Sequence, residues 1–425
     1  MRRVRVGIVG AGALTEGAII PALSGPDMMA PPDSGAWWQR QASSHADIDY
    51  QAPVRPELLA LADKRAERAQ RVGAASRIHA VYTDWRAMLR ETPLDVLICA
   101  LPPDECVEVL WDVHARALPA PLWMWLPGPP APTAAAAADL AASTMTMRIW
   151  CARPWRHASA HRAAQRLIER GEIEAVTALS LRWPASFYRA DKKASTTWGN
   201  GARFDGAALS SSYAALDLLM GFAALSCERA HESRTQAALN SVSARVFQGA
   251  TNVLLGFDNG PTATALFSAA EDWNAPWPRL EICGSHGKSI VCEGGRALQL
   301  LEPREPSRVL STPISPTVSA ANLLGVAEDL KGFFTAWSEA GDASLAAPKY
   351  FPDLNGAARV LESIEAIAEI LQPGAPAAST IGMSLVETES MASGGREKLP
   401  RRITDTARAP DTAGHGQNAV LPLYD

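Results

Sequence analysis

Residues 4–20 read VRVGIVGAGALTEGAII, and this stretch decides the fold that we expect for the first part of the chain. The β-branched run Val4–Val9 predicts a strand, and the apolar spacing through Ile19, Ile20 and Leu23 predicts a helix. Gly10-Ala11-Gly12 lies between the two. A glycine-rich turn in that place lets backbone amides and a helix N-terminus face a pyrophosphate, so the stretch predicts a Rossmann-type domain that binds a dinucleotide.

The predicted cofactor-binding residues come from three places in the first part of the chain. Asp63 closes a second strand, LLALAD, where its carboxylate would accept hydrogen bonds from an adenosine ribose or cap the next helix. Lys64 and Arg65 follow it and would suit a 2′-phosphate, so Asp63 favours NAD while NADP stays open. Thr15 stands where the fingerprint has a third small residue. The full set is Gly10, Ala11, Gly12, Ala13, Leu14, Asp63, Lys64, Leu101 and Pro102.

Strands and helices alternate along residues 1–150, which predicts a parallel sheet. We expect strands at 4–9, 57–62, around Val81, at 95–101 and at 122–125, with helices at 64–72, 85–89, 106–117 and 132–143. The polar and proline-rich stretch 26–56, which holds Trp37 and Trp38, reads as a surface insertion. The fold class is therefore α/β, with a doubly wound Rossmann sheet as the N-terminal domain.

Residues 151–372 follow a different pattern and predict an α+β domain. Alternating runs indicate antiparallel strands covered on one face, at 175–183, 237–247, 251–257, 262–268, 279–283 and 289–292. Helices are expected at 159–170, 327–339 and 356–371. Residues 373–425 have little apolar periodicity and are expected to form a disordered tail.

Composition excludes several classes of partner. The 425 residues carry 40 basic and 45 acidic side chains, a net charge of −5, which argues against nucleic acid. The six cysteines include no CxxC pair, and no acidic residue stands at a spacing that would make it a third metal ligand beside His157 and His161. We therefore expect no bound metal ion. No apolar stretch is long enough to span a bilayer, and we expect a cytoplasmic protein without a membrane partner.

With these elements in order, residues 4–372 resemble the glucose-fructose oxidoreductase, inositol dehydrogenase and MocA (Gfo/Idh/MocA) family. The match is carried by VRVGIVGAGAL, LLALADKRAERA, DVLICALPP, AAQRLIERGEIEAV, LEICGSHGKSIVCEGG and VAEDLKGFFTAWSEA. The resemblance implies an NAD(P)-dependent oxidoreductase with a large open sheet in its second domain. It also implies a small-molecule substrate in the inter-domain cleft and a homo-oligomer formed through the C-terminal sheet.

The residues that the family uses for proton transfer are replaced in this chain. The family's Glu-Lys-Pro motif corresponds to Trp125-Leu126-Pro127, so its lysine is Leu126. On the family's second signature helix, Ala214 stands for the histidine and Ser210 for the first aspartate, and only Asp217 is retained. Neither leucine nor alanine moves a proton. The usual dehydrogenase chemistry is therefore expected to be absent.

Four other residues remain as weak catalytic candidates: Tyr213, Asp217, Arg156 and Lys193. Two interpretations stay open. In the first, the protein is a divergent reductase of a substrate that needs little acid catalysis. In the second, it is a pseudoenzyme that binds the cofactor and acts in sensing, scaffolding or as an accessory protein.

Overall fold

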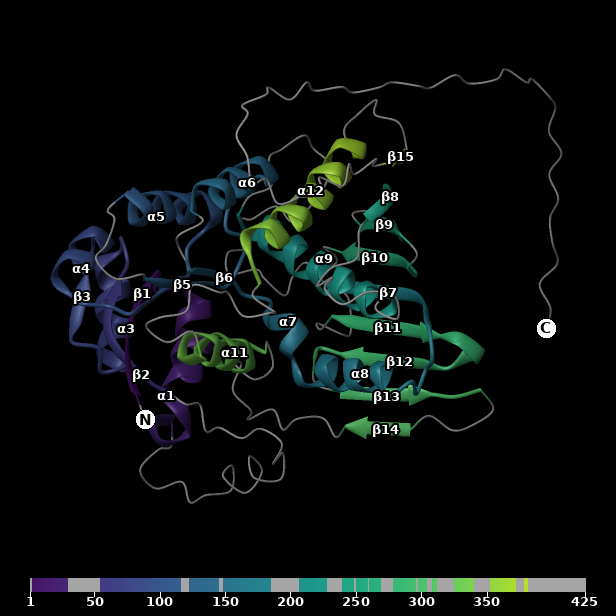
Figure 1. Ribbon diagram of the computed structural model, residues 1–425, viewed down its shortest axis with the longest axis horizontal. Coiled ribbons are helices and arrows are strands. Elements are labelled where there is room, and N and C mark those ends of the chain that lie inside the picture. Colours follow the sequence, from purple (N-terminus) through teal and green to yellow (C-terminus); the bar gives the residue numbers. More distant parts are fainter. Residues whose placement is uncertain are drawn as a thin grey trace, which may run out of the picture. The chain divides into compact units, whose positions relative to one another are not determined.

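The computed structural model describes residues 2–29, 54–115, 122–144, 148–184, 206–227, 239–247, 250–258, 260–268, 278–295, 297–303, 308–311, 325–339, 352–371 and 378–380. Met1–Met383 form one compact unit and Ser384–Asp425 a second, which lies wholly outside the described residues. Most of the expected insertion, Lys193 and the tail beyond Thr380 also lie outside them. The first unit contains two sheets with helices packed on them (Figure 1).

The first sheet has six strands in the order β3-β2-β1-β4-β5-β6, and each pair of neighbours is parallel. This confirms the predicted Rossmann-type sheet, and adds a sixth strand that was not predicted. Its strands are β1 (Arg2–Val9), β2 (Val54–Ala62), β3 (Ala80–Tyr82), β4 (Val96–Cys99), β5 (Trp123–Leu126) and β6 (Arg148–Cys151). The strand order reverses between β1 and β4, and ligands of such sheets bind in the crevice at the carboxyl ends of the strands beside that point.

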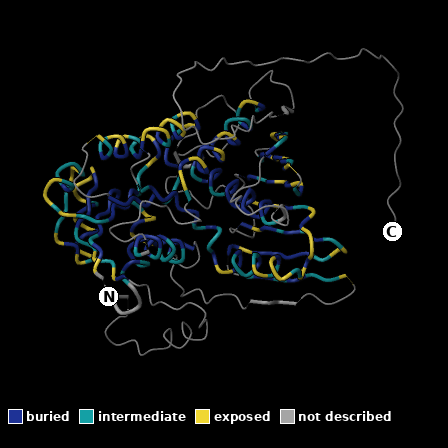
Figure 2. Tube along the Cα trace, in the orientation of Figure 1, coloured by how far each residue is buried: buried dark blue, intermediate teal, exposed yellow. Residues whose placement is uncertain are grey.

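Helices cover both faces of the first sheet, and its central strands are buried between them (Figure 2). On one face lie α4 (Trp85–Glu91), α5 (Pro103–Ala115) and α6 (Ala134–Ser143). The other face packs against η1 (Thr15–Ile19), α1 (Ile20–Met29), α3 (Ala66–Ala75) and α11 (Val326–Glu339). Helix α11 belongs to the part of the sequence assigned to the second domain. Phe333 and Trp337 of this helix nevertheless share a core with Ile8, Trp123 and Trp150 of the first sheet.

The second sheet has nine strands in the order β14-β13-β12-β11-β7-β10-β9-β8-β15. Only β7 and β10 pair in parallel among its described neighbours, which confirms the expected large, mainly antiparallel sheet. Three residues of the expected tail form β15. The strands are β7 (Val176–Pro184), β8 (Leu239–Phe247), β9 (Ala250–Phe257), β10 (Thr262–Ser268), β11 (Arg279–Gly284), β12 (Ser289–Glu293), β13 (Ala297–Leu301), β14 (Arg308–Ser311) and β15 (Ala378–Thr380), with η3 (Ser285–Gly287) joining β11 to β12.

Helices α8 (Ser159–Glu169), α9 (Gly206–Cys227) and α12 (Leu354–Ile370) cover one face of the second sheet. Burial alternates along β9, where Val253 and Leu255 are buried and Asn252 and Leu254 are exposed, as expected for a sheet covered on one side. The short helix α7 (Pro154–His157) follows β6 directly. No helix in the described part of the chain has the length and apolarity needed to cross a membrane.

Candidate functional site

The glycine turn lies at the carboxyl end of β1, between the ends of β2 and β4. Gly10 donates its amide hydrogen to the carbonyl of Ala62 at 2.8 Å, and Ala100 donates to the carbonyl of Val9 at 2.8 Å. Gly10 has a φ of +97°, and a Cβ there would overlap the carbonyl oxygen of Ala100. Only glycine satisfies both conditions. This turn is therefore fixed against both neighbouring strands.

Gly12 faces open space, whereas Gly10 is enclosed. A Cβ at Gly12 would meet no heavy atom within 4 Å. Ala13 and Leu14 next to it are exposed, and the amides of a first helical turn have no acceptor inside the helix. The backbone at Gly12 can therefore be approached closely by a ligand, and an anionic group would be stabilised by the helix N-terminus. This geometry fits a dinucleotide pyrophosphate.

Thr15 fastens the turn from the helix side. Its buried hydroxyl donates to the carbonyl of Gly10 at 2.6 Å. The helix begins here with the π-helical turn η1, and continues as α1. Such wide turns are rare, occur mostly as single turns within α-helices, and are frequent at functional sites. The residue that departs from the fingerprint thus contributes a hydrogen bond that braces the turn.

Asp63 lies under the turn, and its carboxylate is enclosed by donors. Its Oδ2 accepts from the amide of Ala11 at 2.8 Å and from Arg68 Nε and Nη2 at 2.9 and 2.5 Å, while Oδ1 accepts from the amide of Arg65 at 2.9 Å. Burial alone would raise the pKa of Asp63, but the hydrogen bonds from Arg65, Ala11 and Arg68 outweigh it and hold that pKa below its usual value. Asp63 is an anion that joins the turn to α3.

The other predicted cofactor residues border the same turn or lie close to it in the chain. Leu101 approaches Gly10, with Cδ2 3.2 Å from where a Cβ of Gly10 would stand. Pro102 is exposed and its carbonyl accepts the amide of Cys106 at the start of α5. Lys64 pairs with Glu105 at 2.5 Å across the surface. Arg68 was not among the predicted residues, because its contact with Asp63 depends on how α3 follows β2.

The positions that the sequence resemblance assigns to proton transfer are Leu126, Ala214 and Ser210. Leu126 is 1% exposed and packs in the core beneath the end of β5. Ala214 is partly buried and packs against the same core. Ser210 Oγ lies 3.9 Å from where a Cβ of Gly128 would stand, so α9 borders the loop after β5. Ser210 thus lies near the loop that follows Leu126, and neither Leu126 nor Ala214 provides a group that titrates.

Tyr213, one of the weak catalytic candidates, is buried in the core. Its hydroxyl has no hydrogen-bond partner among the described residues. Burial, together with the nearby Cys151 and Asp217, raises the pKa of Tyr213 well above its usual value. A phenol with that pKa is a poor proton donor to a substrate at neutral pH.

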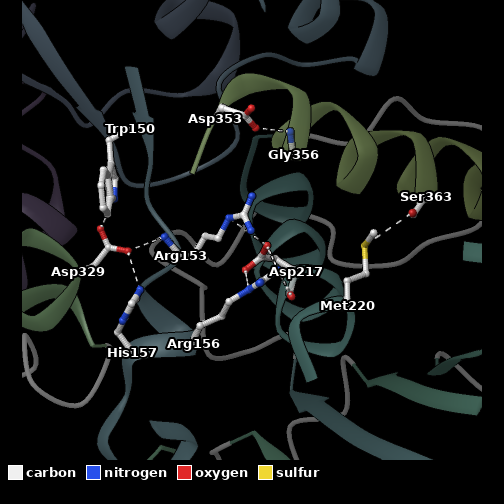
Figure 3. Close-up of polar contacts among 10 residues, drawn as sticks. All are labelled: Trp150, Arg153, Arg156, His157, Asp217, Met220, Asp329, Asp353, Gly356 and Ser363. Carbon is white, nitrogen blue, oxygen red and sulfur yellow. Dashed lines mark hydrogen bonds and ion pairs between the residues drawn. The ribbon is translucent and has the colours of Figure 1, made fainter. Parts of the chain in front are cut away.

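Asp217 and Arg156 form a buried ion pair (Figure 3). Arg156 donates through Nε to Oδ2 at 2.7 Å and through Nη2 to Oδ1 at 2.6 Å. Arg153 Nε lies 3.6 Å from the same carboxylate. A Cβ at Gly221 would come within 2.7 Å of Arg156 Cζ, so the guanidinium lies flat against α9 because position 221 has no side chain. These contacts hold α7 against α9, which is a positioning role for two of the candidates.

Asp329 is a second buried carboxylate, and it was not among the predicted site residues. Its Oδ1 accepts from the indoles of Trp125 and Trp150 at 2.7 and 2.9 Å, and its Oδ2 accepts from the amide of Arg153 at 2.7 Å. Trp125 therefore bonds to a residue 204 positions away in the chain. The only local signal is an acidic residue on an apolar helix face, which does not identify its partners.

The two histidines take separate partners. His161 is buried and its Nδ1 lies 2.7 Å from the carbonyl of Trp155, and burial lowers the pKa of His161 to about 4. His157 Nε2 lies 3.7 Å from Asp329 Oδ2, and burial lowers its pKa as well. Within the described ranges, no group of three or more His, Cys, Asp and Glu side chains is arranged to hold a metal ion.

Solved structures with the same fold are oxidoreductases. Levoglucosan dehydrogenase in complex with NADH and L-sorbose matches with a TM-score of 0.63 at 16% identity, over 87% of this chain and 96% of that one. An oxidoreductase from Thermotoga maritima matches with a TM-score of 0.61 at 16% identity, over 86% and 96%. An oxidoreductase from Agrobacterium radiobacter in complex with NAD+, L-tartaric acid and magnesium matches with a TM-score of 0.59 at 13% identity, over 86% and 94%.

No protein-family model matches the chain, and no curated protein is similar to it in sequence. The likeness to the solved structures is one of fold: a parallel Rossmann-type sheet followed by a large, mainly antiparallel sheet. It confirms the fold that the sequence resemblance implies.

Proposed function

We propose that this protein binds a nicotinamide dinucleotide at the Gly10–Gly12 turn and is an oxidoreductase-like member of the Gfo/Idh/MocA type. The observation that carries the proposal is the contrast between the two glycines: a Cβ at Gly10 would overlap the carbonyl of Ala100 just after β4, whereas a Cβ at Gly12 would meet no heavy atom within 4 Å. Two of the solved structures with a similar fold contain NADH or NAD+, which supports the choice of ligand.

The residues of this chain would bind and orient the dinucleotide. The amides after Gly12 and the start of η1 would hold the pyrophosphate, and the β2 end would hold the adenosine ribose. When bound, a nicotinamide supplies or accepts a hydride. Leu101 and Pro102 follow β4 and would border the cofactor from the other side of the turn. The substrate would be a small molecule beside the ends of β4 to β6, between the first sheet and α9.

Proton transfer limits what the site can do. Leu126, Ala214 and Ser210 replace a lysine, a histidine and an aspartate, and the hydroxyl of Tyr213 is buried. We infer that oxidation of alcohols, which must lose a hydroxyl proton as hydride leaves, is not supported. A substrate that is already polarised, such as an iminium-like acceptor, remains compatible with hydride transfer alone.

A non-catalytic role is the second candidate, and the burial of Leu126 favours it. Leu126, which the sequence resemblance assigns to the family's lysine position, is only 1% exposed and is packed in the core. In this case the chain would bind the dinucleotide and act as a cofactor-sensing, scaffolding or accessory protein. A homo-oligomer formed through the open face of the second sheet is compatible with both candidates, and Leu254 on that face is 50% exposed.

The binding proposal is tested with Gly12→Ala, and Gly17→Ala is the matched control. Both glycines have no heavy atom within 4 Å of an added Cβ, so each variant adds one methyl group without a clash inside the protein. Gly12→Ala should weaken NADH or NADPH binding by roughly tenfold to a hundredfold, because an extra methyl in a packed contact costs about 1–3 kcal/mol. Calorimetric titration of each variant measures it. Equal affinities for the two variants would contradict the proposed site.

Turnover separates the two candidates. Reduced-nicotinamide fluorescence is followed with a panel of sugars and polyols, levoglucosan and L-sorbose included, and with cyclic iminium acceptors. We expect no oxidation of any alcohol, because a positioned base typically supplies a factor of about 10²–10⁴ to such a step. Turnover of an iminium acceptor supports the reductase, and its absence with intact cofactor binding supports the non-catalytic role. Robust alcohol oxidation would show that another group in the site moves the proton.

A further inference from the structure

Asp63 is the residue that the sequence assigns to an adenosine ribose, but its carboxylate is buried and already bonded to four donors of the protein. A carboxylate offers about four lone-pair sites. Oδ2 accepts from the amide of Ala11 and from Nε and Nη2 of Arg68, and Oδ1 accepts from the amide of Arg65. The side chain of Asp63 is only 1% exposed. Arg68 therefore keeps Oδ2 from a ribose diol, and the burial of the side chain limits access to Oδ1.

Arg68 also changes the charge of this part of the pocket. A bare carboxylate at the end of β2 repels the 2′-phosphate of NADP, which is the usual reason for a preference for NAD. Here the guanidinium of Arg68 pairs with that carboxylate at 2.5 Å and offsets its charge. The electrostatic argument for NAD therefore does not apply to Asp63 in the arrangement that the structure shows.

The cations that remain beside Asp63 suit a phosphate. A guanidinium has five N–H donors, so Arg68 keeps three after bonding Asp63, and its side chain is 33% exposed. Arg65 is exposed and has no ion-pair partner in the described part of the chain. Two further cations near Asp63 in the chain have acidic partners: Lys64 pairs with Glu105, and Arg71 pairs with Glu16. Guanidinium groups match the geometry of phosphate oxygens and often bind them through two N–H groups.

We propose that the dinucleotide pocket is built for a 2′-phosphorylated cofactor, NADP(H), and that Arg68 is the specificity-determining residue. The inference rests on the proposed function, since it concerns the ribose end of the same cofactor. Arg68 affects the two cofactors in opposite directions. It withholds Asp63 from the ribose of NADH, and it offers its remaining donors, with Arg65, to the 2′-phosphate of NADPH.

The test is direct titration of NADH and NADPH against the full-length protein at fixed ionic strength, because phosphate contacts depend on salt. The wild type should bind NADPH at least about tenfold more tightly than NADH, as expected for one or two charge-assisted hydrogen bonds. Arg68→Ala should weaken NADPH by about tenfold or more and strengthen NADH several-fold, because Asp63 becomes available to the ribose. A purely structural role of Arg68 would weaken both cofactors alike.

The matched control is Arg71→Ala on the same helix. It removes an equal charge from a pair that does not involve Asp63, and it should leave the ratio of NADPH to NADH affinity within about twofold. The wild-type ratio tests the proposal even if Arg68→Ala folds poorly. Equal binding of both cofactors by the wild type, or tighter NADH, overturns the inference about Arg68 while keeping the proposed function. Failure of the wild type to bind either one overturns the proposed function and this inference with it.

Discussion

Replacing Asp217 with asparagine should destabilise the fold strongly, although the change removes only one charge. The carboxylate is 4% exposed and holds the guanidinium of Arg156, which is itself 12% exposed, through two short hydrogen bonds. An asparagine keeps one acceptor oxygen and turns an NH₂ donor toward the second guanidinium N–H. Arg153, 6% exposed and 3.6 Å from the same carboxylate, loses its counter-charge as well.

The magnitude follows from the inability of Arg156 to leave. Its guanidinium lies against Gly221, one turn along α9 from Asp217, where a Cβ would come within 2.7 Å of Cζ, and its side chain is only 12% exposed. Removing one partner of a buried pair typically costs about 3–5 kcal/mol, because the other charge is left uncompensated. We expect Asp217→Asn to lower the free energy of unfolding by that amount.

The assay is urea unfolding at 25 °C and pH 7, followed by tryptophan fluorescence. The control is Glu16→Gln, which breaks the Arg71–Glu16 pair whose side chains are 58% and 44% exposed. An exposed pair contributes about 0–1 kcal/mol and is weakened by salt, whereas the buried pair is screened much less. If Asp217→Asn costs no more than Glu16→Gln, the ion pair does not hold α7 against α9 as described.

Three further outcomes are expected. Acidification from pH 6.5 to pH 4 should lower the free energy of unfolding by about 1.4 kcal/mol per pH unit on account of His161. The pKa of His161 is about 4 in the fold and 6.5 in the unfolded chain, so the unfolded state binds more protons in this window. His161→Gln should flatten this pH dependence, and an unchanged slope in urea titrations would contradict the assignment. A chain ending at Met383 should keep the melting temperature of the full chain, whereas one ending at Pro373 should melt at a lower temperature because it lacks the pairing of β15 with β8. Equal melting temperatures of the two shortened chains in scanning calorimetry would argue against that pairing. Leu254→Glu should shift the protein toward monomer in analytical ultracentrifugation, since Leu254 lies on the open face of the second sheet; unaltered association would place the interface elsewhere.

Most of the fold follows from patterns that are local in the sequence. Glycines after a β-branched run, alternating burial and helical spacing are set by backbone geometry over a few residues, and they predicted both sheets with most of their strands. The parallel pairing of β7 with β10 was not predicted. It joins segments separated by β8 and β9, and nothing in either strand alone distinguishes a parallel neighbour from an antiparallel one.

Parts of the candidate site could likewise be located from the sequence, and other parts could not. The glycine turn and Asp63 could be located from the sequence, because their role depends on their place at strand ends. The partners of Asp63 and Asp217 could not. Arg68 reaches Asp63 from the first turn of α3, and Asp329 meets Trp125 across 204 positions of chain. Such contacts depend on how helices pack, which the spacing of apolar residues does not specify.

The position of α11 has a consequence for how the protein is made. During synthesis the ribosome releases all six strands of the first sheet long before residues 326–339 emerge, and Trp123, Trp125 and Trp150 then lack the helix that covers them. Asp329, which accepts hydrogen bonds from two of these indoles, arrives with the same helix. The first 150 residues are therefore a segment whose nascent form exposes an aromatic surface, and they should need a chaperone or the rest of the chain to stay soluble. Expressed alone they should aggregate, and addition of a separate 325–371 fragment should reduce that aggregation.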